Sequence, residues 1–417
     1  MGIKIGIVGF GEFSESFLDL FLTHPDVDKV VGAELMKDRR EHILSTYGVS
    51  KMYESYEDML TQETDLDCIG IFTQRHQHGP MIIAALKAGK NVFSAVPMSC
   101  EIEESKEIIR LVEEKRLIYM SGETCYYFPC AIYCREKYKT GAFGKFVYGE
   151  SQYYHDITEM FDSFSGSGGD GWKRIAGIPP MYYSTHSMSM MFLSIGEHPV
   201  EVSCVGFEDD LGDGIYGKGN NNWDNPFSNE SALFKMSGGG VARINEFRRC
   251  GTAKPSSYIT SLIGTHANYQ NAGMHHVFTK GPVFGQETEV EYVSELINTV
   301  KYTQNKDKID LNKNPAEYTY HRGYSPVHDL KRLPVAHRDI PDGGHNGSHA
   351  FLVDDFVRAV MTGKLPPNNA WDSAICSIPG IIAHESAMLG GKPLPVPFLG
   401  NPPEDWKRID YNDRIYD

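Results

Sequence analysis

Two glycines near the start of this 417-residue chain have a spacing that can serve phosphate binding. They lie in Gly9-Phe10-Gly11-Glu12-Phe13-Ser14, between a strand-like and a helix-like run, with serine where a third glycine is common. In such a turn the first glycine permits a tight bend, and the second lets backbone amides approach a diphosphate at the helix N-terminus. We therefore predict dinucleotide binding by Gly9, Phe10, Gly11, Glu12 and Phe13, with an ordinary glycine-containing turn as the alternative.

A carboxylate, that of Glu34, stands 20 residues after Ser14, where the second strand of the pattern ends. A carboxylate at this point accepts hydrogen bonds from ribose hydroxyls and repels a 2′-phosphate, which favours NAD over NADP. Three basic residues just beyond it leave NADP open as an alternative: Lys37, Arg39 and Arg40.

These residues must be positioned by a parallel sheet, because the first 125 residues alternate short β-branched runs with amphipathic segments. Strands are predicted over 3–8, 29–33, 68–72, 91–94 and 118–120, and helices over 12–22, 37–47, 78–88 and 102–115. The predicted fold of this part is α/β, a doubly wound Rossmann domain over residues 1–125.

The pattern changes after about residue 128, where strand candidates follow one another without regular helices between them. A helix is predicted over 131–139, strands over 146–155, 200–207, 231–236, 241–247 and 258–264, and closing helices over 349–362 and 370–389. The polar stretch 213–229 is predicted to be a loop, either a binding loop or a solvated insertion. Residues 126–417 are therefore predicted to form an α+β domain with an open, mostly antiparallel sheet, for substrate binding and oligomerisation.

Composition excludes several classes of partner. The formal net charge is −15, and no lysine- and arginine-rich run could bind a phosphate backbone or an acidic membrane. No apolar run approaches the roughly 20 residues of a membrane helix, and the chain starts directly in a strand-like run without a signal peptide. We expect a cytoplasmic protein that binds neither nucleic acid nor membranes.

The eight cysteines are too few for a disulfide scaffold and fit reduced thiols. Cys125, Cys130 and Cys134 are clustered, but their spacing matches no common zinc pattern. Histidines in two further segments lack an accompanying carboxylate pattern: His275, His276, His345 and His349. No metal site is predicted.

Further segments resemble the glucose-fructose oxidoreductase, inositol dehydrogenase and MocA family. The glycine turn is followed by Thr73-Gln74-Arg75-His76-Gln77-His78 before a helix, and by Gly89-Lys90-Asn91-Val92-Phe93 leading to Pro97. The resemblance implies a sugar substrate and a cofactor site that includes Thr73, Gln74, His78, Val96 and Pro97. Members of that family usually carry Glu-Lys-Pro where this chain has Ala95-Val96-Pro97, and Val96 cannot transfer a proton.

A narrower resemblance is to the NAD-dependent α-N-acetylgalactosaminidase branch, which also replaces this lysine by an apolar residue. The similar segments are Ser151-Gln152-Tyr153-Tyr154-His155-Asp156, Trp172-Lys173-Arg174, Tyr183-Ser184-Thr185-His186, Gly122-Glu123 and 343–349. The resemblance implies that Glu123 lies near the nicotinamide ribose, that Tyr153 and His155 contact the sugar, and that Tyr183 and His186 flank the reacting hydroxyl. Substrate contacts by Trp172, Lys173 and Arg174 are expected on the same basis, and Trp172 could instead anchor a loop.

Hydride loss from a sugar carbon needs a base on the hydroxyl of that carbon. Because the ordinary pKa of histidine is about 6.5 and that of tyrosine about 10, His186 is the expected base, assisted by Tyr183. The resulting ketone acidifies the neighbouring C–H, so that a glycosidic group one carbon further can leave and water can replace it.

Three functions follow as alternatives. The first is redox-neutral glycoside hydrolysis with tightly held NAD, the second is a sugar or polyol dehydrogenase without the usual lysine, and the third is a non-catalytic NAD-binding protein. By analogy with the family, a homodimer or homotetramer is expected through the open sheet face.

Overall fold

The computed structural model describes residues 2–251, 255–273, 275–281, 287–298, 323–338 and 344–410. The chain divides into two compact units. The first unit is assembled from Met1–Thr124, Asp329–Ala374 and Leu399–Asp417, and the second from Cys125–His328 and Ile375–Phe398. The predicted division into 1–125 and 126–417 is drawn along the chain, whereas these units are discontinuous.

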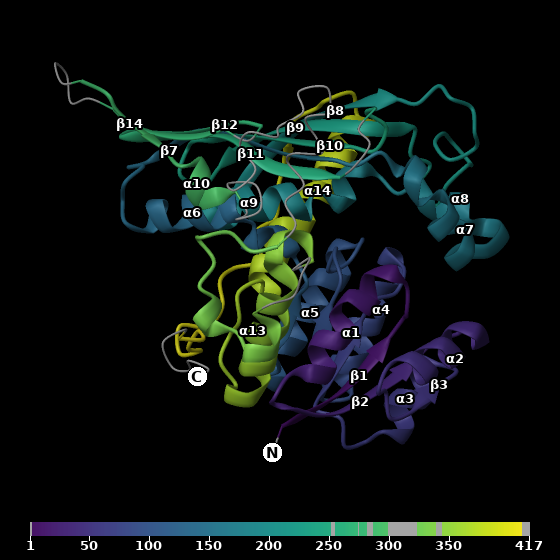
Figure 1. Cartoon of the computed structure of the whole chain (residues 1–417). Coiled ribbons are helices and arrows are strands. Elements are labelled where there is room, and N and C mark those ends of the chain that lie inside the picture. Colours follow the sequence, from purple (N-terminus) through teal and green to yellow (C-terminus); the bar gives the residue numbers. More distant parts are fainter. Residues whose placement is uncertain are drawn as a thin grey trace, which may run out of the picture. The chain divides into compact units, whose positions relative to one another are not determined.

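The first unit contains the predicted Rossmann sheet, six parallel strands in the order β3-β2-β1-β4-β5-β6. Strands β1, β2 and β3 are labelled in Figure 1. The strands are β1 (Ile3–Val8), β2 (Val27–Ala33), β3 (Met52–Tyr53), β4 (Cys68–Ile71), β5 (Asn91–Ser94) and β6 (Tyr119–Ser121). The order reverses beside β1, and ligands of doubly wound sheets bind at such a point. The predicted α/β class is confirmed.

The helices of this unit include the four that were predicted, with ends that agree to within about one residue. They are α1 (Glu12–Thr23), α2 (Lys37–Thr46), α3 (Tyr56–Gln62), α4 (His78–Lys87), α5 (Ile102–Lys115) and α13 (Ser348–Thr362). Helices and sheet together form an aromatic core, in which Phe17 of α1, Phe72 after β4 and Phe356 of α13 surround Phe93 of β5 at ring-centroid distances of 5.4–5.8 Å. Sequence patterns missed β3 and α3, which are too short to show a period.

The second unit contains a nine-stranded sheet in the order β14-β13-β12-β11-β7-β10-β9-β8-β15. The strands are β7 (Phe146–Tyr154), β8 (Pro199–Glu208), β9 (Phe227–Met236), β10 (Val241–Phe247), β11 (Ser256–Gly264), β12 (Ala267–Ala272), β13 (His275–Lys280), β14 (Glu289–Tyr292) and β15 (Leu394–Pro395). All neighbours are antiparallel except β7 and β10, which run parallel. The predicted mostly antiparallel sheet is therefore confirmed.

Helices α6 (Pro129–Lys139) and α9 (Thr185–Ile195) lie against one face of this sheet (Figure 1). Further helices are α7 (Phe161–Gly168), α8 (Trp172–Ala176), α10 (Ser294–Ile297) and α14 (Ala370–Met388), which starts in the first unit and continues in the second. The prediction of no regular helix between β7 and β8 is wrong. Helix α9 was missed because it is buried almost all round and so shows no amphipathic period.

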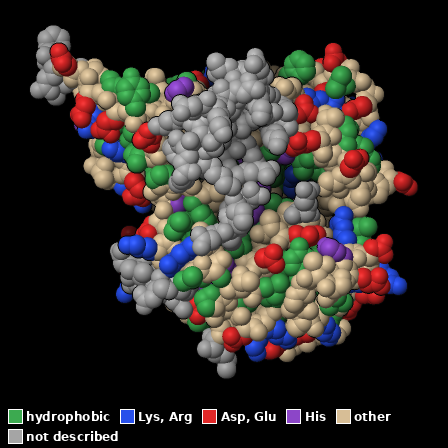
Figure 2. Space-filling view, in the orientation of Figure 1, with side chains coloured by type: hydrophobic (Ala, Val, Ile, Leu, Met, Phe, Trp, Pro, Cys, Tyr) green, Lys and Arg blue, Asp and Glu red, His purple; other side chains and the backbone are tan. Residues whose placement is uncertain are grey.

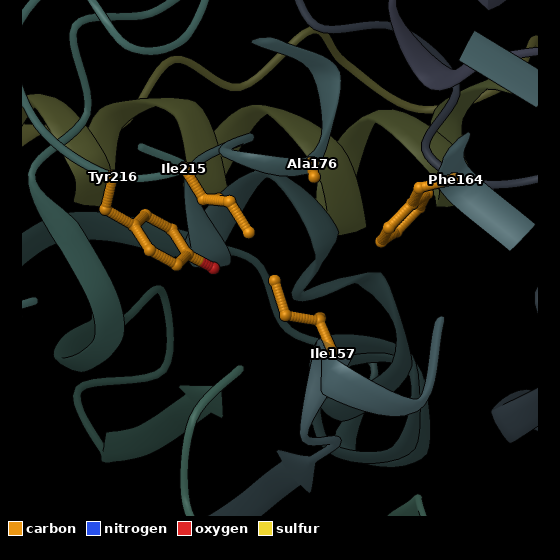
Figure 3. Packing of buried hydrophobic residues seen from close by; sticks show 5 residues of the cluster. All are labelled: Ile157, Phe164, Ala176, Ile215 and Tyr216. Carbon is orange, nitrogen blue, oxygen red and sulfur yellow. The ribbon is translucent and has the colours of Figure 1, made fainter. Parts of the chain in front are cut away.

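A small apolar cluster joins α7 and α8 to the long loop before β9 (Figure 3). Its members are Ile157, Phe164, Ala176, Ile215 and Tyr216. Helix α7 is rich in serine and glycine, which have low helix propensity, so this packing rather than local sequence stabilises it. The loop is thus packed against a core instead of forming a solvated insertion, and it ends at β9, which begins at Phe227 within the predicted loop 213–229.

Asn221 holds this loop in shape. Its side chain is buried, donates to the carbonyls of Ile215 and Asn225, and accepts from the amides of Trp223 and Asn225 at 2.8–3.1 Å. In this loop, the Asn221 side chain therefore supplies hydrogen-bond partners that regular secondary structure would otherwise give to the backbone.

The exposed surface carries both signs of charge. On the face shown in Figure 2, lysine and arginine side chains are scattered among aspartate and glutamate side chains and form no continuous basic area. None of the helices in the described residues is long and apolar enough to cross a membrane.

Replacing Asn221 by alanine should destabilise the protein by about 2–4 kcal/mol, because buried backbone groups lose their partners. The measurement is chemical denaturation followed by fluorescence. Lys218→Ala, at an exposed position of the same loop, is the control and should change stability by less than about 0.5 kcal/mol. Equal effects of the two substitutions would contradict this role for Asn221.

Acid should weaken the first unit through His78, which is fully buried. Burial lowers the pKa of His78 to about 4, against a usual value near 6.5, so folding favours the neutral ring. This contribution is fully present above about pH 6.5 and is lost as pH falls through 4, by up to about 3 kcal/mol. Denaturation of the wild type and of His78→Gln between pH 7 and 4 checks this, since the variant should have the flatter profile and parallel profiles would refute it.

Candidate functional site

The turn between β1 and α1 has the geometry that phosphate binding needs. Gly9 has a φ of +84°, and a Cβ there would lie 2.8 Å from the carbonyl oxygen of Phe72, so both bend and close approach require glycine. A Cβ built at Gly11 meets nothing within 4 Å. Within the described residues, the amides of Gly11, Glu12 and Phe13 donate to no acceptor. Three amides at a helix N-terminus therefore fit a diphosphate.

Glu34, directly after β2, is tied to this turn. One carboxylate oxygen accepts the amide of Phe10 at 2.8 Å and the other accepts the amide of Met36 at 2.9 Å. The Arg40 guanidinium donates to the carbonyls of Glu34 and Leu35, so this cation supports the backbone of the turn. The predicted ribose ligand is therefore also the residue that fixes the orientation of Phe10.

His78 connects the ends of β4 and β5. Its Nδ1 lies 2.8 Å from the Pro97 carbonyl and its Nε2 lies 3.0 Å from the Thr73 carbonyl. A neutral ring donates only one of these bonds, and burial keeps the ring neutral at pH 7 by lowering its pKa to about 4. His78 thus positions the segments that carry Thr73, Gln74, Val96 and Pro97, which are themselves predicted cofactor contacts.

Glu123, after β6, is buried in the first unit, and its carbonyl accepts the side-chain amide of Asn368 at 3.1 Å. Residues 344–349, which lead into α13, lie in the same unit and contact the first turn of α1. The His345 and His349 rings approach Phe13 edge-on at 5.6 and 5.7 Å, and their Nδ1 and Nε2 atoms lie 2.8 Å apart. Gly343, the first residue of the segment 343–349, lies outside the described residues.

The second unit brings three of its predicted catalytic rings together. Tyr153 lies near the end of β7, Tyr183 precedes α9, and His186 lies in its first turn. The His186 ring meets Tyr153 and Tyr183 edge-on, with centroids 4.8 and 5.0 Å apart, and the two tyrosine rings lie 5.9 Å apart. Residues 30 positions apart in the sequence are thus joined because α9 packs on β7.

Tyr153 continues into a chain of polar contacts. Its hydroxyl lies 2.5 Å from Nδ1 of His155, and Nε2 of His155 lies 2.8 Å from a carboxylate oxygen of Glu159. Burial raises the pKa of Tyr153 well above its usual value, so its phenol stays protonated at neutral pH. The arrangement can pass a proton between the buried ring cluster and the more exposed Glu159.

A buried cation, Arg248, completes the cluster. It follows β10, is 2% exposed, and places its guanidinium 5.2 Å from the Tyr153 ring centroid and 4.6 Å from that of Tyr183. Burial acts to lower the pKa of Arg248, but Tyr153, Tyr183 and Glu246 raise it on balance. The guanidinium therefore stays charged although it is buried.

The predicted substrate residues Trp172, Lys173 and Arg174 lie on α8 and hold neighbouring segments. Trp172 packs on the small apolar cluster with its ring 5.1 Å from Phe161. Lys173 donates to the carbonyl of Asp213 and Arg174 to the side chain of Asn222, both in the loop before β9. Their substrate contacts remain predictions, while their loop-anchoring contacts are observed.

Sequence reasoning missed Glu159 and Arg248. Glu159 stands four residues after His155, a spacing that could have indicated the pair. Arg248 continues the alternation of Ile244 and Glu246 on β10, all buried on one side, which could have indicated an inward-facing cation. Neither pattern specifies a ligand without the fold.

Comparisons with known proteins agree with this geometry. Residues 3–123 match the model of an oxidoreductase family with an NAD-binding Rossmann fold, the Gfo/Idh/MocA family. A glycosyl hydrolase family 109 protein of Streptomyces filamentosus is 25% identical over 97% of this chain and 78% of that protein. A trans-1,2-dihydrobenzene-1,2-diol dehydrogenase of Mus musculus is 25% identical over 49% of this chain and 60% of that protein.

A solved structure of levoglucosan dehydrogenase in complex with NADH has the same fold, with a TM-score of 0.71 and 16% identity over 96% of this chain and 100% of that one. The agreement extends through both units, and the motif-bearing turn lies inside the matched family region. Residues 3–123 therefore form an NAD-binding Rossmann domain of the glucose-fructose oxidoreductase, inositol dehydrogenase and MocA family, and the chain as a whole shares the fold of the levoglucosan dehydrogenase structure.

Proposed function

We propose that this protein hydrolyses glycosides by a redox-neutral route with NAD as a resident cofactor. The observation that carries the proposal is the convergence of three rings in one cluster, the buried Tyr153 and His186 and the half-buried Tyr183. The chain has Val96 at the position of the family's usual lysine, so proton transfer must come from other side chains. The cluster supplies those side chains in a single place.

NAD would be held by the amides of Gly11, Glu12 and Phe13 and by Glu34, with Thr73, Gln74, Val96, Pro97 and Glu123 as further expected contacts. When bound, it accepts a hydride from a sugar carbon and later returns it to that carbon. His78 acts as a positioning residue, because both of its ring nitrogens contact backbone carbonyls.

His186 is the proposed base for the sugar hydroxyl. It takes the hydroxyl proton as the carbon loses hydride, and it gives the proton back when the carbonyl is reduced. Tyr183 supports this step by orienting the hydroxyl and the imidazole, which it meets edge-on. Proton and hydride are both restored, so the sugar carbon ends in its original oxidation state.

The carbonyl makes the neighbouring C–H acidic, and Tyr153 with His155 serves the elimination that follows. His155 removes this proton, and Tyr153, which is protonated at neutral pH, gives its phenolic proton to the departing glycosidic oxygen. Water then adds to the unsaturated sugar: its hydroxyl bonds to the carbon that carried the leaving group and its other proton goes to Tyr153, while His155 returns its proton to the neighbouring carbon. Glu159 accepts a hydrogen bond from His155 and stabilises its charged form.

The relatives named glycosyl hydrolase family 109 support this choice over a simple dehydrogenase, because their similarity spans 97% of the chain. Dehydrogenases are also among the relatives, and those matches cover about half of the chain.

Substituting His186 by alanine should reduce glycoside turnover by at least about 100-fold, the contribution expected of a positioned base. The assay uses chromogenic glycosides without added reductant, and hydrolysis in D₂O should place deuterium on the carbon between the oxidised carbon and the leaving group. His275→Ala, at an exposed site on β13, should leave both readouts unchanged. Hydrolysis without deuterium incorporation, or NADH formed in proportion to sugar, would contradict the proposal.

Glu34→Ala should weaken NAD binding by about 10- to 100-fold, because a charged acceptor of the Phe10 amide and of the ribose is lost. NADP binding should not decrease, since the repulsion of its 2′-phosphate is removed. Calorimetric titration of cofactor-depleted protein measures both affinities. Glu41→Ala, an exposed carboxylate on α2, is the control, and equal affinity of the wild type for NAD and NADP would refute the preference.

A further inference from the structure

Arg248 presents an unusual charge balance in the second unit. It is 2% exposed, and its guanidinium forms no hydrogen bond and no ion pair with any described residue. Its Nη1 atom in particular is fully buried and without an acceptor. A buried cation whose donors lack acceptors costs several kcal/mol, and two cation–π contacts offset only part of this.

The groups around Arg248 give its guanidinium no acceptor among the described residues. Tyr153 stays a neutral phenol, because burial raises its pKa well above its usual value. Glu246 precedes Arg248 by two residues on the same side of β10 and raises the pKa of Arg248, but its carboxylate accepts the hydroxyl of Ser187 and forms no ion pair with Arg248. The guanidinium donors are therefore left without acceptors beside the cluster of Tyr153, Tyr183 and His186.

The next residue shows how this unit treats a structural arginine. Arg249 forms ion pairs with Asp209 at 3.1 Å and Asp213 at 2.5 Å. Lys173 and Arg174 are likewise engaged, with the carbonyl of Asp213 and the side chain of Asn222. Arg248 differs from all three because its guanidinium N–H groups have no acceptor among the described residues. Such unsatisfied donors are expected of a group that binds a ligand.

We propose that Arg248 binds an anionic substituent of the substrate, and that the protein acts on a singly charged sugar, a uronic acid or a sulfate ester. The inference rests on the proposed function, since it assigns the Tyr153–Tyr183–His186 cluster to the sugar. A planar guanidinium offers paired donors to a carboxylate or sulfate. One available cation matches one negative charge, whereas a phosphate dianion would call for a second.

The protein's net charge of −15 gives anionic sugars no long-range attraction, so selectivity must come from this short-range contact. A neutral sugar would leave Arg248 buried without a partner. A singly charged sugar would give the guanidinium its missing acceptors and should therefore bind much more tightly.

The test measures the affinity of the NAD-loaded protein for sugars by calorimetry. Methyl glucuronide is compared with methyl glucoside, and methyl galacturonide with methyl galactoside. Glucose 6-sulfate is measured as a third charged ligand. The charged sugar should bind about 100-fold more tightly than its neutral counterpart. Comparing the affinity for the uronides with that for the sulfate ester shows which anionic group Arg248 binds. Equal binding of charged and neutral sugars, or binding of neither, overturns the proposal.

Two variants separate binding from folding. Arg248→Gln should abolish the preference for the charged sugar while leaving binding of the neutral one nearly unchanged, and Arg248→Lys should retain part of the preference. Arg243→Gln removes an exposed arginine of β10 and should leave the preference intact. If Arg248 were purely structural, its replacement would weaken binding of both sugars equally, together with a lower melting temperature.

Because binding is measured without turnover, the two proposals can fail separately. Arg248-dependent binding of a uronate that is never hydrolysed would refute the glycosidase proposal alone. Hydrolysis of neutral glycosides with no gain from a charged group would refute the role of Arg248 alone.

Discussion

The first unit depends on three backbone amides at the start of α1 that donate to no acceptor among the residues the structure describes. The left-handed conformation of Gly9 turns the chain sharply after β1, and Glu34 takes up the Phe10 amide, so the next amides point onward from an ordered turn. Unsatisfied helix N-terminal donors carry a partial positive charge, which suits a diphosphate. This constraint gives a strongly acidic chain a local site for an anionic cofactor.

The second unit also contains polar groups that lack protein partners among the described residues, and here they belong to side chains instead of the backbone. Its ring cluster contains one imidazole, His186, one phenol that stays protonated, Tyr153, and beside them one guanidinium with an unsatisfied donor, Arg248. Arg248 departs from what a stable core would select, since apolar packing would avoid buried polar groups without partners. Under the proposed function, this cluster supplies the proton transfer that the side chain of Val96 cannot.

Much of the first unit could be predicted because its signals are local. The glycine turn, the β-branched runs and the amphipathic period of α5 each identify an element from neighbouring residues alone. The second unit is held by contacts that local patterns do not encode. The fold of α7 depends on Ile215 and Tyr216 from a distant loop, and that loop depends on four hydrogen bonds of Asn221.

The candidate site divides in the same way. Tyr153, Tyr183 and His186 could be named from residue type and resemblance, and the fold brings their rings together. Glu159 and Arg248 could not be assigned, because the role of each depends on its surroundings: an imidazole for Glu159, and a missing hydrogen-bond acceptor for Arg248 among the described residues. Trp172 illustrates the reverse case, a residue of the right type for sugar stacking that packs on a small core.

The most direct test of this account is to denature the purified protein and measure the dinucleotide that is released. A resident cofactor predicts near-equimolar NAD, recovered in the oxidised form after glycoside has been turned over. Protein that releases none, and that fails to bind added NAD, would contradict the central claim.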